Sequence, residues 1–142
     1  MATANVERNK AIMRSIVESN DARQFDAYLD VVSEDFVGHN HFVPGDLRGN
    51  KALSYFFYQT EAVAFPDGVH TIHHLYGEDD LVTLELSYTG TFVAPLPNGT
   101  PPNGQVCEFR YNMICRFEND KVAEIWWYPY DSYSLMKQLG MI

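Results

Sequence analysis

The feature that most constrains this chain is a change in apolar periodicity near its middle. Before residues 65–68 (Phe-Pro-Asp-Gly), apolar residues recur at intervals of three and four, which is typical of helices. After this segment they alternate with polar residues, as strands with one buried face do. Proline disfavours helix at the residue before it, so the segment ends the helical half. Helices followed by a meander of strands predict one α+β domain over residues 1–142, its helices packed on a curved antiparallel sheet.

The helical half contains three apolar stripes, and each predicts a helix. Asp21, with Gln24 three residues later, resembles a capping box that begins the second helix. The stripes consist of Ile12, Met13, Ile16 and Val17; of Phe25, Tyr28, Leu29 and Val32; and of Leu53, Phe56, Phe57, Thr60 and Ala64.

The second half predicts four strands over residues 69–76, 81–92, 105–117 and 122–130, and a short helix over residues 132–139. In the third strand nearly every apolar side chain falls on one face, so the helices must cover that face. A curved sheet closed by helices on one side can leave a cavity between the two layers.

Composition excludes several classes of partner. The formal net charge of −9 favours solubility and repels nucleic acid and anionic lipid. No run of about 18 apolar residues is present, and the N-terminus lacks an apolar signal core. We therefore predict a cytoplasmic protein with neither nucleic acid nor a membrane as partner. Cys107 and Cys115 lie too far apart along one straight strand for a disulfide, which predicts two free thiols.

Several short motifs, taken in order, resemble the SnoaL-like polyketide cyclases and ester cyclases of the nuclear transport factor 2 superfamily. The most specific begins at Trp127 and includes Asp131, which Gln138 follows by seven positions. The resemblance implies a cone-shaped α+β barrel around a pocket, a homodimer and acid/base chemistry without a cofactor. The other matching segments are Asp35-Phe36-Val37-Gly38-His39, Phe65-Pro66-Asp67, Gly90-Thr91 and Pro101-Pro102-Asn103-Gly104.

The sequence departs from the family pattern at the catalytic positions. The family's aspartate corresponds to Tyr128 or, if one residue is inserted, to Trp127, and neither is a carboxylate. The family's partner histidine falls near Met113 or Asn112. Other groups must therefore move protons if this pocket is catalytic.

His39, Asp131 and Tyr128 are the candidate catalytic residues. Histidine titrates near neutral pH, and a tyrosine hydroxyl can stabilise a developing oxyanion. We expect His39 and Asp131 to border one cavity. Asp131 is also predicted to be the N-cap of the final helix, and the two roles are compatible. The candidate substrate-binding residues are His41, Tyr88, Phe109, Tyr111, Met113, Trp127 and Phe57.

No metal or other cofactor is expected. His39 and His41 could form half of a metal site, but the sequence offers no convincing third ligand. Of the three histidines in 69–76, we expect one to point inward. Phosphate-binding loops, nucleophile elbows and dinucleotide fingerprints are absent from the sequence.

These observations favour a cofactor-independent enzyme that cyclises, isomerises or hydrates a small apolar molecule of natural-product type. A non-catalytic binding protein of the same fold is the alternative, because the family's acid/base pair is missing. A third possibility is a domain that serves mainly to dimerise.

Overall fold

The computed structural model describes residues 2–40 and 43–142 and has a helical layer packed on a six-stranded sheet. The elements in the first half are α1 (Ala2–Asp21), a 3-10 turn η1 (Leu29–Val31), β1 (Val32–His39), β2 (Leu47–Arg48), α2 (Asn50–Phe57) and a π-helical segment η2 (Tyr58–Val63). Those in the second half are β3 (Val69–Glu78), β4 (Leu81–Thr91), β5 (Val106–Glu118), β6 (Lys121–Pro129) and α3 (Ser132–Gln138).

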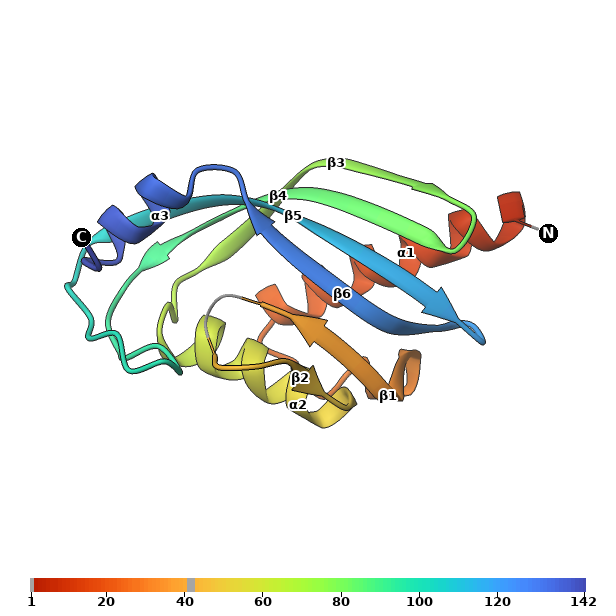
Figure 1. Cartoon of the computed structure of the whole chain (residues 1–142), viewed down its shortest axis with the longest axis horizontal. Helices are drawn as coiled ribbons and strands as arrows, with labels where there is room; N and C mark the ends of the chain where they lie inside the picture. Colours follow the sequence, from red (N-terminus) through yellow and green to blue (C-terminus); the bar gives the residue numbers. More distant parts are fainter. Residues whose placement is uncertain (1, 41–42) are drawn as a thin grey trace.

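The strands follow the order β2-β1-β6-β5-β4-β3, and the sheet is mixed. Strands β3 to β6 form an antiparallel meander, whereas β1 runs parallel to β6. Figure 1 shows α1 and α2 on the same side of the twisted sheet, with α3 at the end opposite the N-terminus. The predicted α+β class is confirmed.

Two details of the first half differ from the sequence prediction. The stripe from Phe25 to Val32 does not form an α-helix. It contains only a 3-10 turn at Leu29–Val31, and its last residue, Val32, begins β1. Val32 and Phe36 instead bury their side chains as part of a strand paired with β6. This parallel pairing corrects the expectation of a wholly antiparallel sheet. Asp21 caps no second helix, since it is the last residue of α1.

The strand alternation in the second half is confirmed. In β5, Cys107, Phe109, Met113 and Cys115 are all buried on one face, while Glu108 and Arg110 on the other face are exposed. Both cysteines are buried free thiols, as predicted.

The buried side chains form two clusters. The larger one lies between α1, α2 and the sheet and includes Met13, Phe36, Leu84 and Ile125. The smaller one lies at the end of the sheet near α3 and includes Phe65, Phe92 and Leu139 among others. Within the described chain, no helix is both long and apolar enough to span a membrane.

Candidate functional site

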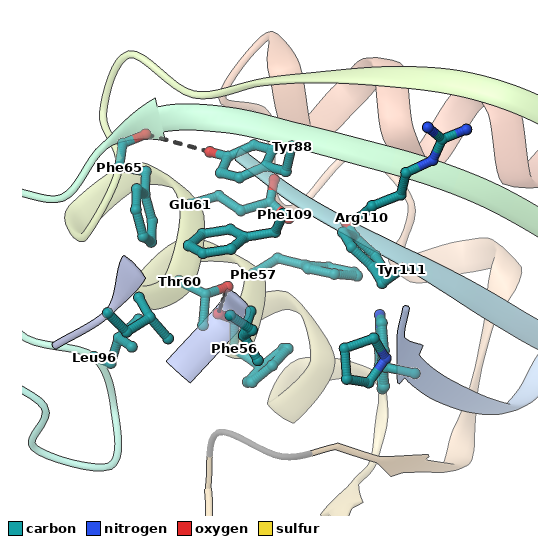
Figure 2. A pocket seen from close by; sticks show the side chains of 14 residues that line it. Phe56, Phe57, Thr60, Glu61, Phe65, Tyr88, Leu96, Phe109, Arg110 and Tyr111 are labelled. Atoms are coloured by element: carbon teal, nitrogen blue, oxygen red, sulfur yellow. Dashed lines mark hydrogen bonds between the residues drawn. The ribbon is translucent and has the colours of Figure 1, made fainter. Parts of the chain in front are cut away.

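A cavity lies between the two buried clusters. The centre of a water molecule can move through about 90 Å³ of this space. Fourteen residues line it, and seven of them are aromatic (Figure 2). They are Phe56, Phe57, Thr60, Glu61, Phe65, Tyr88, Leu96, Phe109, Arg110, Tyr111, Trp127, Pro129, Leu135 and Leu139.

Most of the candidate substrate-binding residues border this cavity. Phe57, Tyr88, Phe109, Tyr111 and Trp127 all line it.

Two candidate binding residues do not appear in the lining. Met113 is 2% exposed and packs within the larger buried cluster, so it serves the core. His41 lies outside the described residues.

The candidate catalytic residues do not meet at the cavity. His39 ends β1, where its Nε2 is 2.7 Å from a Glu124 oxygen and its Nδ1 is 3.0 Å from an Asp46 oxygen. The Glu124 hydrogen bond, against a smaller opposing effect of burial, raises the pKa of His39. Its ring stacks on Trp126. His39 is therefore held in a network of charged groups away from the residues that line the cavity.

Asp131 is the N-cap of α3, where its carboxylate accepts a hydrogen bond from the Ser134 backbone N–H at 2.9 Å. Tyr128 is 49% exposed and lines no part of the cavity. The expectation that His39 and Asp131 border this cavity is therefore wrong. Their catalytic roles stay a prediction that the cavity's geometry does not support.

The acidic residue in the cavity is Glu61. It lies in η2, where the α-helix widens into a π-helical turn, a feature that often occurs at functional sites. Its side chain rises from this segment toward the rings of Tyr88 and Phe109 (Figure 2). The residue is 5% exposed, and its Oε1 atom has no hydrogen-bond partner among the described residues. A buried polar atom without a partner is rare and calls for an explanation.

Behind Glu61 lies the inward histidine of β3. The Nε2 atom of His70 is 3.5 Å from Glu61 Oε2, and its Nδ1 atom is 2.6 Å from Asp21 Oδ1. Asp21 also accepts the His70 backbone N–H, so it fixes both the ring and the strand. Burial alone would lower the pKa of His70, but Glu61 and Asp21 together outweigh burial and raise it to about 9. His70 is thus an imidazolium between two carboxylates at neutral pH.

Two tyrosines complete the polar part of the cavity. Burial, followed by the charge of Glu61, raises the pKa of both Tyr88 and Tyr111, so both stay protonated. The Tyr88 hydroxyl donates to the Phe65 carbonyl at 3.3 Å (Figure 2). The Tyr111 hydroxyl makes no hydrogen bond within residues 2–40 and 43–142. It is therefore available to a ligand.

Asp21, Glu61 and His70 also have donor atoms close enough together to be considered as metal ligands. However, the two carboxylates contact opposite nitrogens of the same ring. A metal ion on one nitrogen could not bind the carboxylate that faces the other. The three residues form a chain of ion pairs, and a metal site would require the ring to turn.

The sequence does contain a signal for Glu61. It follows Phe57 by four positions and precedes Ala64 by three, which places a carboxylate on the apolar face of the predicted helix. Asp21 and His70 carry no comparable signal, because their meeting depends on how α1 packs on β3.

The chain matches one known protein family over most of its length. A family model described as SnoaL-like polyketide cyclase matches residues 10–139. No curated protein matches the chain in sequence.

Several solved structures are similar in fold. A proposed SnoaL-like polyketide cyclase from Jannaschia sp. CCS1 has a TM-score of 0.80 and 17% identity, and the match covers 96% of this chain and 94% of that one. TsrD from Streptomyces laurentii has a TM-score of 0.79 and 20% identity over 96% and 97% of the two chains. AclR from Streptomyces galilaeus, a proposed hydroxylase, has a TM-score of 0.74 and 22% identity over the same shares. At these identities the likeness shows the fold.

Proposed function

This chain belongs to the SnoaL-like polyketide cyclase family, and from that premise we propose that it is a cofactor-independent acid/base enzyme. Its substrate is a small, mostly apolar molecule, which it cyclises, isomerises or hydrates in the aromatic cavity. The observation that carries the proposal is the buried Glu61 carboxylate, whose Oε1 atom has no partner and which lines this cavity. In this chain the position of the family's own aspartate is held by Tyr128 or Trp127 on β6, so Glu61 on η2 would supply the carboxylate from another element.

In this proposal Glu61 is the general base. Its Oε2 atom faces His70, which leaves Oε1 to accept a proton from the substrate. The Tyr111 hydroxyl donates a hydrogen bond to the substrate oxygen on which negative charge develops. The aromatic walls exclude water and strengthen both interactions. Acid/base assistance of this kind is worth about 10²–10⁴ in rate.

A general-base test does not require the natural substrate. 5-Nitrobenzisoxazole is a flat, apolar molecule that loses its C3 proton to a base as its N–O bond breaks, giving a coloured cyanophenolate. We expect the wild-type protein to catalyse this elimination and Glu61→Gln to reduce kcat/KM by at least about tenfold. The matched control is Glu78→Gln, an exposed position at the end of β3. Thermal melts should show that each variant is folded.

The same assay separates the alternatives. Loss of activity in His39→Ala, with Glu61→Gln unaffected, would restore the assignment made from the sequence. A folded wild-type protein that binds the probe but leaves it unchanged favours the non-catalytic binding protein. The replaced family aspartate is the observation that favours this second candidate.

We also propose that the protein is a homodimer formed through the outer face of the sheet. α1 and α2 lie against the opposite face (Figure 1), and Tyr76, Tyr128 and Tyr130 remain about half exposed. Light scattering at micromolar concentration should give twice the chain mass of 16.3 kDa. Tyr128→Glu should lower this to one chain, while Tyr55→Glu, at an exposed position on α2, should not. A wild-type mass near 16.3 kDa would contradict the proposal.

A further inference from the structure

The charges at the base of the cavity do not balance. Two carboxylates, Asp21 and Glu61, share the single imidazolium of His70, whose side chain is 3% exposed. Asp21 is the closer partner, at 2.6 Å against 3.5 Å for Glu61. The cluster therefore carries one excess negative charge, and the less well paired carboxylate is the one that lines the cavity.

Neighbouring cations do not supply the missing charge. Arg110 lines the cavity but directs its guanidinium away from it (Figure 2) and is paired with Glu85 at 2.6 Å. Arg23 donates to the carbonyl groups of Phe65, Pro66 and Gly68. Within the described part of the chain, neither arginine forms an ion pair with Glu61 or Asp21.

The walls of the cavity suit a cation. Aromatic rings present a negative face, which attracts ammonium groups, and the effect grows when the cation leaves water. Here seven aromatic residues line the same cavity as the carboxylate. The imidazolium of His70 does not occupy the cavity itself. Its ring packs against Tyr88, with 4.5 Å between the ring centres, and is not part of the cavity lining.

We propose that the cavity binds a small apolar amine in its ammonium form, with the N–H group donating to Glu61 Oε1 and the carbon skeleton against the aromatic rings. The carboxylate and the ammonium neutralise each other, and the Glu61 Oε1 atom gains a hydrogen-bond partner. The inference rests on the proposed function only in using the same cavity, for which it names a class of ligand that competes for the Oε1 atom.

Three ring compounds of nearly equal size test this directly: cyclohexylammonium, cyclohexanol and cyclohexanecarboxylate. Isothermal titration at pH 7 should show the ammonium binding at least tenfold more tightly than the alcohol, and no binding of the carboxylate. Glu61→Gln should bind the ammonium and the alcohol equally, and the retained alcohol binding shows that its cavity is intact. Glu78→Gln should behave as the wild type does.

Equal affinity of the wild-type protein for the ammonium and the alcohol would overturn the inference, as would a preference that survives in Glu61→Gln. If Glu61→Gln does not fold, the order of the three affinities in the wild-type protein decides. This outcome is separate from the elimination assay. A protein that catalyses elimination but has no cation preference keeps its proposed function and loses this inference.

Discussion

Raising the pH from about 6.5 to 9 should lower the free energy of unfolding by roughly 3 kcal/mol through His70 alone. Its pKa is raised from 6.5 to about 9 in the folded protein. Below pH 6.5 the histidine is protonated in both states, and the stabilisation by Asp21 and Glu61 is complete. Between the two pKa values the unfolded chain loses this proton while the folded protein keeps it, so stability falls as pH rises.

Urea unfolding at pH 6, 7.5 and 9.5 measures this effect. His70→Asn should be less stable at pH 6 and should lose much less stability on going to pH 9.5. His74→Asn is the matched control, since this histidine lies on the same strand with a side chain that is 66% exposed. If the unfolding free energy falls equally with pH in the wild-type protein and in His70→Asn, then His70 is not protonated between the two carboxylates.

Gly68→Ala should destabilise the protein by about 2–3 kcal/mol, because there is no space for a methyl group. A Cβ atom at Gly68 would lie 1.9 Å from the Tyr88 hydroxyl oxygen and 2.2 Å from Cζ. The Tyr88 ring cannot move aside easily, since it is 5% exposed and packs edge-on against Phe65 and beside His70. Any movement that relieves the clash would also deform the cavity.

A double-mutant cycle isolates this contact. Tyr88→Leu removes the ring, so the double variant should be more stable than the sum of the two single changes predicts. Gly99→Ala is a useful comparison: it has a positive φ of 89° but nothing within 4 Å of its Cβ position, so it reports backbone strain alone. Additive effects in the cycle would show that Tyr88 is not the residue that excludes a side chain at Gly68.

The second half of the fold could be predicted from the sequence because its information is local. Alternation in β4, β5 and β6, together with tight turns between them, specifies both the strands and their pairing. β1 could not be found in this way. Its middle is polar, with Glu34 and Asp35 exposed, and its pairing partner β6 is distant in the sequence.

The aromatic lining of the cavity could be predicted from the sequence, but its acid/base group could not. Aromatic residues on the apolar face of the strands had to point toward the helices, and four of them, Tyr88, Phe109, Tyr111 and Trp127, line the cavity. The acid/base group arises differently. Asp21, Glu61 and His70 come from a helix end, a π-helical turn and a strand, and each has an ordinary local explanation. Only their packing brings them together.

The parallel pairing of β1 with β6 has a consequence for how the chain is made. Gly38 and His39 lie opposite Ile125 and Trp126, so β1 has no partner except the two-residue β2 until nearly the whole chain has been synthesised. α1 packs on β3 and β4, which are synthesised earlier, whereas α2 packs on β1 and so depends on the same late pairing. Contacts this distant in sequence slow folding and leave apolar surface exposed during synthesis. Completion of β6 is therefore the event that closes the fold, and truncation before residue 121 should leave a product that aggregates.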